Sequence, residues 1–479
     1  MTEHLTAKRA ITTRAMVIVG TFGLVAGCTV GENYRRPAVT SPAAFRVGAG
    51  TAAADPASLA DLKWFEVFND ERLQQMIRTA LAQNHDIRDA VVRVEAARAN
   101  LGITRADQFP TIEAGAGVTT LRASANGSVP FPQGVDQTRT FGAVGVSLLS
   151  FEVDVWGRLR RATEAARADL LASDHNRKAV MTTLVSDVAG AYFSLLELDM
   201  ELAIAKRTLA VREKSLELIR SRDRGGLGTL LEVRQGEQLV HGAAQAIPAI
   251  ELLIEQTENQ ISFLLGGSPG AIRRGRSLGE QDAPPSVPAG LPSSLLDRRP
   301  DISAAEQNLV AANADIGVAK AAYFPRISLT GLFGFQSDQL ASLFSGSTRV
   351  WQFAPQVTQP IFNAGRIRST VALAEAQRDL ALIQYERAIQ TAFREASDAL
   401  IQYQKVREIR AEQELLVATL QDRARMSYVR YEGGIDTLLN ALDADRDLFA
   451  AELGLAQTTR DELLSIVQLY RALGGGWQQ

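Results

Sequence analysis

The chain contains two copies of one long pattern, and this internal duplication constrains its fold more than any other feature. Four pairs of motifs carry it: Asp86-Ile87 with Asp301-Ile302 and Phe109-Pro110 with Phe324-Pro325 at an offset of 215 residues, then Gly157-Arg158 with Gly365-Arg366 and Gly225-Gly226 with Gly433-Gly434 at an offset of 208. The change in offset places a seven-residue insertion or deletion between Ile112 and Gly157. Each copy spans roughly 200 residues, whereas solenoid repeats are much shorter. We therefore expect two copies of one large unit rather than a repeat array.

Each copy is predicted to hold a first helix, two strands and a pair of very long helices. The first helices are expected over 70–106 and 296–322, and each ends at a Phe-Pro pair. Proline stops a helix because it disfavours the helical backbone conformation of the residue before it. The helix after the strands has an apolar seam with spacings of three and four: Val180, Leu184, Val188, Ala191, Leu195, Leu198, Leu202, Ala205 and Leu209. This seam is typical of a coiled coil and predicts a helix over about 160–223, roughly 95 Å long, with a counterpart over 366–432.

Four other stretches carry almost no charge and lack a helical pattern: Thr111–Ser124, Arg139–Val153, Arg326–Gln336 and Arg349–Phe362. In the third, alternate apolar residues share one face: Ile327, Leu329, Gly331, Phe333 and Phe335. Polar loops, Ala125–Thr138 and Ser337–Thr348, separate the members of each pair. We therefore expect two β-hairpins with strands of about 10–14 residues, long enough to cross a bilayer when tilted.

The N-terminal segment resembles a bacterial lipoprotein signal. Three basic residues (Lys8, Arg9 and Arg14) precede the uncharged, mostly apolar stretch Ala15–Gly27, which ends in small residues before Cys28. We expect cleavage before Cys28, then diacylglycerol on its sulfur and an acyl chain on its amine, because two or more chains anchor stably where one does not. Thr29 is the residue that follows Cys28. An aspartate at this position would retain the lipoprotein at the inner membrane, so threonine favours sorting to the outer membrane. The alternative is a buried free cysteine in an anchor helix.

Composition excludes several functions. The chain has 51 basic and 54 acidic residues, a net charge of −3, which argues against a nucleic-acid partner. It has one cysteine and four histidines that lie far apart, so a metal site is not expected. The sequence has no P-loop, no G-x-S-x-G and no H-E-x-x-H motif. We expect no enzymatic activity and no cofactor beyond the covalent lipid on Cys28.

The predicted organisation follows from these patterns. It runs in chain order: signal peptide 1–27, extended N-terminal segment 28–69, first repeat 70–275 with a hairpin at 111–153, Pro-rich linker 276–295, second repeat 296–473 with a hairpin at 326–362, and tail 474–479. The predicted fold class is mainly α with a membrane β part. It consists of long antiparallel coiled-coil helices plus four strands per chain.

Several local motifs, taken together, resemble the TolC-like outer membrane factor family, and most closely the NodT-type lipoprotein components of RND-type multidrug efflux systems. The motifs that carry the resemblance are Cys28-Thr-Val-Gly-Glu-Asn-Tyr34-Arg-Arg-Pro37, Asp154-Val-Trp-Gly-Arg158, Arg298-Arg-Pro-Asp-Ile302, Phe324-Pro-Arg-Ile-Ser-Leu329, Thr358-Gln-Pro-Ile-Phe362-Asn-Ala-Gly-Arg366, Tyr431-Glu-Gly-Gly434, Leu442-Asp-Ala444 and Leu469-Tyr-Arg-Ala-Leu-Gly-Gly-Gly-Trp477. They span nearly the whole mature chain.

The resemblance implies a homotrimer that spans the outer membrane and extends into the periplasm. Physical reasoning agrees, because four strands cannot close a barrel and unpaired backbone groups are prohibitively costly in lipid. Three copies supply 12 strands, which is an allowed barrel with an aqueous lumen. The long helices are then expected to continue the tube as a periplasmic α-barrel.

The implied function is a passive exit duct of a tripartite pump that exports drugs or other small molecules. Its implied partners are a periplasmic membrane-fusion (adaptor) protein, an inner-membrane RND-type pump and outer-membrane lipid. Two alternatives stay open from the sequence. The same tube can serve protein or peptide secretion, and long hairpins also occur in a periplasmic adaptor or structural coiled-coil lipoprotein.

The second Gly-rich turn carries the candidate gate. Leu439, Asp443 and Arg446 are spaced by four and three residues and share one helical face, which by itself indicates no more than a surface ion pair worth under ~1 kcal/mol. By resemblance, Asp443 forms an acidic ring and Leu439 an apolar ring at the closed entrance. Tyr431 and Arg446 take part in bonds that hold the inner coiled coil shut, and an outward, iris-like movement of the second long helix pair opens it.

The two Gly-rich turns are the candidate contacts for the adaptor, again by resemblance. The residues assigned to them are Gly225, Gly226 and Thr229 in the first turn, and Gly433, Gly434 and Thr437 in the second.

Overall fold

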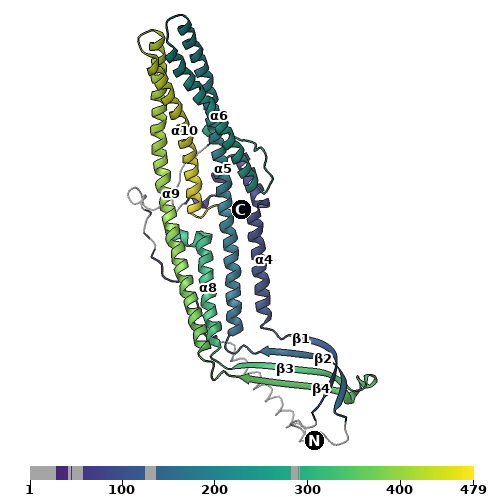
Figure 1. Cartoon of the computed structure of the whole chain (residues 1–479). Helices are drawn as coiled ribbons and strands as arrows, with labels where there is room; N and C mark the ends of the chain where they lie inside the picture. The colour runs from purple at the N-terminus through teal and green to yellow at the C-terminus, as the bar shows by residue number, and fades with distance from the viewer. Residues whose placement is uncertain are drawn as a thin grey trace. The chain divides into compact units, whose positions relative to one another are not determined.

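The computed structural model describes residues 29–40, 42, 45, 58–124, 136–281, 290 and 292–478. The signal peptide and Cys28 lie outside the described residues. In the first repeat, the elements are α2 (Trp64–Val67), α3 (Glu71–Gln83), α4 (His85–Ala106), β1 (Ile112–Arg122), β2 (Thr138–Glu152), α5 (Arg158–Arg224) and α6 (Leu230–Leu264). In the second repeat, they are α7 (Leu295–Arg298), α8 (Pro300–Ala321), β3 (Arg326–Ser337), β4 (Arg349–Thr358), α9 (Arg366–Glu432) and α10 (Leu438–Ala472). Figure 1 shows these elements along the chain.

The predicted duplication is visible in the lengths of the helices. α5 and α9 both have 67 residues, α6 and α10 both have 35, and α4 and α8 both have 22. The helices predicted over 160–223 and 366–432 are confirmed as α5 and α9. The fold class predicted from sequence, mainly helical with four strands, is also confirmed.

The first helix of each copy is interrupted, so the predictions of unbroken helices over 70–106 and 296–322 were wrong. The first break occurs at Asn84, whose Oδ1 accepts hydrogen bonds from the backbone N–H groups of Asp86 (2.8 Å) and Ile87 (3.2 Å). Its Nδ2 donates to the carbonyl of Leu264 at the end of α6 (2.9 Å). Asn84 therefore begins α4 as a cap and holds the end of a second helix.

The break in the second copy lies at the equivalent position, Arg299. Pro300 is the first residue of α8, where its missing N–H costs nothing, and it keeps Arg299 out of the helical conformation. Arg299 Nη1 donates to the carbonyl of Ala472 at the end of α10 (3.1 Å). Ala472 is the counterpart of Leu264, so both copies bind the same helix end with different side chains.

The predicted extended segment 28–69 was also partly wrong. Residues Leu59–Asp61 form a 3₁₀ turn and Trp64–Val67 form α2, and Leu59 and Trp64 are buried in the core. The driving force is burial of these large apolar side chains, which a fully extended segment would leave in water.

The chain divides into two compact units, which are described separately. The first is formed by the described residues within 1–37, 95–172 and 306–384, and it contains the sheet, most of α8 and parts of α4, α5 and α9. In it, α8 packs against α5 through Ala165, Ala168, Ala311 and Ala314, and against α9 through Ile316, Ala319, Val371 and Ala374. Small alanine side chains let these helices approach closely.

The four strands form one antiparallel sheet in the order β1-β2-β3-β4, with β1 and β4 at its two edges (Figure 1). The two predicted hairpins are confirmed, and β2 and β3 join them into a single sheet. A bulge interrupts β2 between Leu148 and Phe151. β4 ends at Thr358 rather than at the predicted Phe362, because Pro360 has no N–H for a strand ladder.

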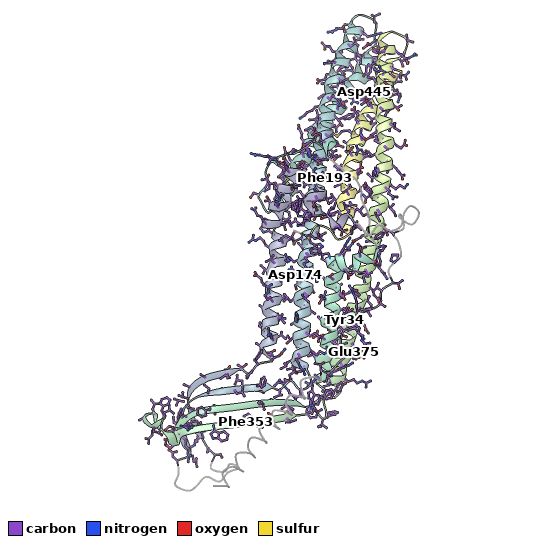
Figure 2. The ribbon with its side chains drawn as sticks, turned by 180° about the vertical axis from the view of Figure 1, so that it is seen from behind. Tyr34, Asp174, Phe193, Phe353, Glu375 and Asp445 are labelled. Carbon is purple, nitrogen blue, oxygen red and sulfur yellow. The ribbon has the colours of Figure 1, made fainter. Side chains whose placement is uncertain are left out.

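The two faces of the sheet differ in polarity. Cross-strand pairs place on one face the residues Ile112, Ala114, Ala116, Val118, Val144, Val146, Leu148, Ile327, Leu329, Phe333, Phe335, Trp351, Phe353 and Val357. The opposite face carries the polar residues Glu113, Thr119, Arg139, Ser147, Ser328, Thr330, Gln336, Gln352 and Gln356 together with Leu121, Phe141, Leu332 and Val350, and Arg122 and Arg349 lie on the first face at its loop end. Trp351 is 74% exposed, and the strand ladder puts Phe353 of β4, which Figure 2 labels, on the same face. An apolar face this exposed indicates that the sheet contacts something other than water.

The second unit is formed by the described residues within 38–94, 173–305 and 385–479. Its largest fully buried side chains include Leu59, Leu73, Ile77, Tyr192, Leu195, Ile261, Leu295 and Tyr470. One stretch of α5 is long and apolar enough to cross a membrane, but 67% of it is buried inside the protein. The helix is therefore read as a core helix of the bundle.

A carboxyl group is buried in this core. Glu197 of α5 is 3% exposed, and Arg460 Nη1 of α10 lies 3.2 Å from its Oε2. Burial, followed by repulsion from Glu201 one helical turn away, raises the pKa of Glu197 to about 7 despite the arginine. The folded protein therefore holds this proton more tightly than the unfolded chain does.

We predict that Glu197→Gln reduces the pH dependence of stability. Between the ordinary pKa of 4.5 and about 7, unfolding releases the proton of Glu197, so the free energy of unfolding falls as pH rises, by ~3 kcal/mol in total. The variant should show a flatter profile in denaturant unfolding followed by circular dichroism. Glu408→Gln, which changes an exposed carboxyl of α9, is the control and should keep the wild-type slope. Equal slopes in all three proteins would contradict the assignment.

Candidate functional site

The turns that join α5 to α6 and α9 to α10 have the same backbone design. Gly226 (φ 73°) and Gly434 (φ 70°) occupy the left-handed region just after a helix end. The N–H groups of Leu227 and Ile435 then bond back to carbonyls of the preceding helices, at 2.8 and 2.9 Å. This is the Schellman ending, in which glycine avoids the steric cost of positive φ. The Gly-Gly pairs predicted as turns are therefore confirmed as helix ends.

The two turns differ in how the next helix begins. In the first, Thr229 and Glu232 form a reciprocal capping box at the start of α6. In the second, Thr437 makes no side-chain cap, and Asp436 instead accepts hydrogen bonds from the N–H of Thr437 (2.8 Å) and from Asn440 Nδ2 (2.7 Å). These bonds, with the nearby Arg430, lower the pKa of Asp436. The same fold thus presents two chemically different turns.

Both turns expose large apolar side chains beside the predicted adaptor-contact glycines and threonines. These are Leu227 in the first turn with Leu230 and Leu231 at the start of α6, and Ile435 in the second turn with Leu439 at the start of α10. Leu227 is 75% exposed. Clustered exposed aliphatic residues at the tip of a water-facing helix pair are typical of a protein contact surface.

Tyr431 lies at the point where the tips of the long helices meet. It is buried against Leu216 and Ile219 of α5 and Leu438 of α10. The guanidinium of Arg222 lies over its ring, 4.7 Å from the centroid. Burial raises the pKa of Tyr431. The predicted role of Tyr431 in holding the tips together thus has a specific partner, Arg222, which the sequence did not suggest.

The other three candidate gate residues share one face of α10, as their spacing predicted. Leu439 is half exposed, and Asp443 and Arg446 form an ion pair of 3.3 Å within the helix. Arg446 also lies 3.3 Å from Asp447. Tyr431 and Arg446 therefore have different partners within one chain. The carboxylate of Asp443 stays accessible to solvent.

Sequence reasoning missed a buried ion pair beside this face. Arg212 of α5 donates from Nε to Asp445 Oδ2 of α10 at 2.6 Å, and their side chains are only 4% and 10% exposed. Arg212 Nη1 donates to the carbonyl of Leu239 in α6 (3.0 Å), and the guanidinium lies 5.0 Å from the ring centroid of Phe449. Figure 2 places Asp445 near the turn end of α10. One arginine thus connects three helices close to the candidate gate.

A signal for this pair was present in the sequence. Arg212 falls on the apolar seam of α5, between Leu209 and Leu216, at spacings of three and four residues. Asp445 falls on the corresponding seam of α10, four residues after Ala441. A charge at a buried seam position needs a partner, because an unpaired buried charge is costly.

Comparisons with known proteins connect these features to a described family. The sequence profile described as outer membrane efflux protein matches residues 76–267 and 291–475. The toluene efflux pump outer membrane protein TtgC of Pseudomonas putida is 38% identical over 461 residues, which cover 95% of this chain and 94% of that protein. The outer membrane protein OprJ of Pseudomonas aeruginosa is 37% identical over 477 residues, 98% and 97% of the two chains. The open-state structure of the Neisseria gonorrhoeae MtrE outer membrane channel matches with a TM-score of 0.84 and 31% identity, covering 94% of this chain and 99% of that one.

We predict that the Arg212–Asp445 pair shows strong coupling in a double-mutant cycle. Arg212→Met or Asp445→Leu alone should lower the free energy of unfolding by about 3–5 kcal/mol, because each leaves one buried charge without its partner. The double variant should lose less than either single variant. The exposed pair of Arg423 and Asp447 is the control, and its single variants should cost under ~1 kcal/mol. Additive losses at Arg212 and Asp445, measured by denaturant unfolding in detergent, would contradict the prediction.

Proposed function

The chain belongs to the outer membrane efflux protein family and is an outer-membrane channel of an efflux system, and from this premise we propose that three copies form one duct for small organic molecules. The family is one of channels and not of enzymes, as the sequence predicted. The alternative of a periplasmic adaptor is thereby set aside.

The open sheet supports assembly into a trimer. β1 and β4 each have one edge that no other described strand pairs with, and one face of the sheet is apolar and exposed. In hydrocarbon each unpaired backbone group costs several kcal/mol, so the sheet must be closed by further strands. Three copies of four strands give 12, a barrel with a water-filled lumen lined by the polar face. This edge geometry is the observation that carries the proposal.

The segment after Cys28 supports a lipid anchor at the membrane boundary. Val30 donates from its N–H to the carbonyl of Trp156 (2.9 Å), at the junction of β2 and α5. The buried Arg161 donates from Nη2 to the carbonyl of Gly31 (3.0 Å) and to Asn33 Oδ1 (2.8 Å). The residues that follow Cys28 are thus held where the strands end and the water-exposed helices begin. Acyl chains on Cys28 would enter the lipid beside the strands.

The tips of the long helices support a gated entrance that docks an adaptor protein. A residue that faces the axis of a trimer occurs three times around it, so Asp443 would form an acidic ring and Leu439 an apolar one. The exposed Leu227 and Ile435 on the two turns are suited to an apolar contact with a periplasmic adaptor. The adaptor would connect the duct to an inner-membrane RND-type pump that supplies the energy.

The names of relatives support the proposed substrate class. The relatives include a toluene efflux pump protein, a solvent efflux pump protein and an antibiotic efflux pump protein, all from Pseudomonas putida. We extend from these to small apolar or amphipathic organic molecules for this chain. Selection among them would rest with the pump rather than with the duct.

Trimer formation is tested by the mass of the detergent-solubilised protein. Native mass spectrometry of the mature chain should give three copies per particle, and circular dichroism of the same sample should report both helix and strand. A stable monomer that retains its strands would contradict the closed barrel.

We predict that Asp443→Ala raises the single-channel conductance of the duct in planar bilayers. The substitution removes three carboxylates from the constriction and frees Arg446 from its intrahelical partner. Asp422→Ala, which breaks a similar exposed ion pair with Arg425 on α9, is the matched control and should leave conductance unchanged. Equal conductance in all three proteins would remove Asp443 from the gate.

A further inference from the structure

We propose that Arg349 and Arg122 bind the phosphate groups of a glycolipid of the outer leaflet, on the lipid-facing side of the sheet at its loop end. The ligand is a lipid whose sugar head carries two phosphates, as lipopolysaccharide does. The inference rests on the proposed trimer, and it adds a lipid partner and the residues that recognise it.

Charge is distributed unequally between the two faces of the sheet. The strand ladders place two acidic and two basic residues on the polar face: Glu113, Glu152, Arg139 and Arg326. Two of them, Glu152 and Arg326, form an ion pair of 2.6 Å. On the apolar face, the described strands carry only two charged residues, Arg122 and Arg349, and both are basic. The face that meets lipid is therefore positively charged.

Both arginines lie at the loop end of the sheet. Arg122 is the last residue of β1 and Arg349 is the first residue of β4, next to the loops over 123–137 and 338–348. The other ends of the strands lead into the helices α4, α5, α8 and α9. Because the long helices extend into the periplasm in the proposed duct, the loop ends lie at the level of the outer leaflet. A basic residue on the lipid face is costly at the bilayer midplane and tolerated near its boundary.

Neither guanidinium has a carboxylate partner among the described residues. Arg122 donates from Nη1 to Thr138 Oγ1 and from Nη2 to Gln137 Oε1, both at 3.3 Å, and these acceptors are neutral. Arg349 forms no ion pair within the described part of the chain. The neighbouring stretch 125–135 contains no acidic residue. Guanidiniums without a fixed carboxylate are free to bind phosphate, whose oxygens match their planar N–H groups.

Aromatic side chains lie beside Arg349 on the same face. Trp351 follows it by two residues in β4, and Phe335 is its direct partner in β3. Phe344 of the following loop packs edge-on against Phe335, with 5.5 Å between ring centroids, and is 71% exposed. Aromatic residues are enriched at the boundary between lipid head groups and acyl chains. Trp351 and Phe344 would thus contact the acyl chains of the lipid whose phosphate Arg349 binds.

Assembly gives each site its second arginine. β1 and β4 are the edge strands of the sheet, so in the proposed barrel they are neighbours that belong to two copies. Arg349 of one copy and Arg122 of the next then lie at the same end of adjacent strands and on the same face. Three equivalent sites follow from the symmetry. A head group with two phosphates engages both guanidiniums, whereas a lipid with one phosphate engages a single one.

Titration with lipid A, the phosphorylated anchor of lipopolysaccharide, tests the site. The delipidated trimer in detergent should bind up to three lipid A molecules, counted by native mass spectrometry. Arg349→Gln and Arg122→Gln should each weaken binding about ten-fold, because each removes charge-assisted hydrogen bonds to phosphate. Arg139→Gln changes an arginine at the same end of the sheet but on the polar face, so this matched control should bind as the wild type does. Unchanged affinity in both Arg349→Gln and Arg122→Gln would overturn the proposal.

Two further lipids test the chemistry of the ligand. Lipid A without its phosphates and phosphatidylglycerol, which has one phosphate, should each bind the wild-type trimer about ten-fold more weakly than intact lipid A. Equal binding of the dephosphorylated form would mean that only the aromatic residues contact lipid. Equal binding of phosphatidylglycerol would mean a general site for anionic lipids. Either result would refute a glycolipid site.

The same spectra separate this inference from the proposed function, because they report the number of copies in each particle. A trimer whose lipid binding ignores both arginine substitutions would leave the assembly intact and remove the lipid site. A monomeric wild-type protein would instead refute the assembly. If one of the two substitutions prevents trimer formation, the other still decides whether an arginine on the lipid face binds phosphate.

Discussion

The rest of the structure depends on the backbone hydrogen bonds of the sheet edges. An α-helix satisfies its own N–H and C=O groups, but a strand needs a neighbour on each side, and hydrocarbon offers no water to replace one. β1 and β4 each pair with one other described strand only, while the apolar face of the sheet is exposed. A single chain is therefore an incomplete membrane structure. Its strands need partners beyond those that the described strands provide, and the proposed trimer supplies them.

Equivalent positions in the two repeats show which contacts are the same in both copies and which differ. Asn84 and Arg299 differ in charge and size, yet both donate to the last carbonyl of the equivalent long helix. The helix ends at Gly226 and Gly434 are the same in both copies, because only glycine meets the positive φ without strain. Trp156, by contrast, stacks on Phe324 at a centroid distance of 4.7 Å, while its counterpart is Ala364. The two repeats therefore differ at this position, because Ala364 has no ring to stack.

Sequence patterns predicted the long helices and strands closely because both signals are local and each appears twice. The apolar seam placed the start and end of α5 within two residues, and the low charge of the strands located both hairpins. The break at Asn84 was not predicted: its cap bonds to Asp86 and Ile87 are local, but its bond to Leu264 joins residues 180 positions apart. The Arg212–Asp445 pair was missed for the same reason, since its partners are 233 residues apart. Cys28 and the adaptor-contact residues remain predictions, because neither the lipid nor the partner is encoded in the fold of one chain.

The position of the buried ion pair limits how the proposed gate could open. Asp443 and Asp445 lie on different faces of α10, one accessible and the other fixed to Arg212 of α5. Any outward movement that separates α10 from α5 at this level would break this ion pair, and it would be costly wherever a charge stays buried without its partner. Beyond this level, Leu216 and Ile219 of α5 pack in one buried cluster with Leu438 of α10, and Arg222 of α5 lies over the ring of Tyr431 of α9. A movement in which α10 stays paired with α5 at Asp445 and separates from it only towards the turn would keep the Arg212–Asp445 pair intact.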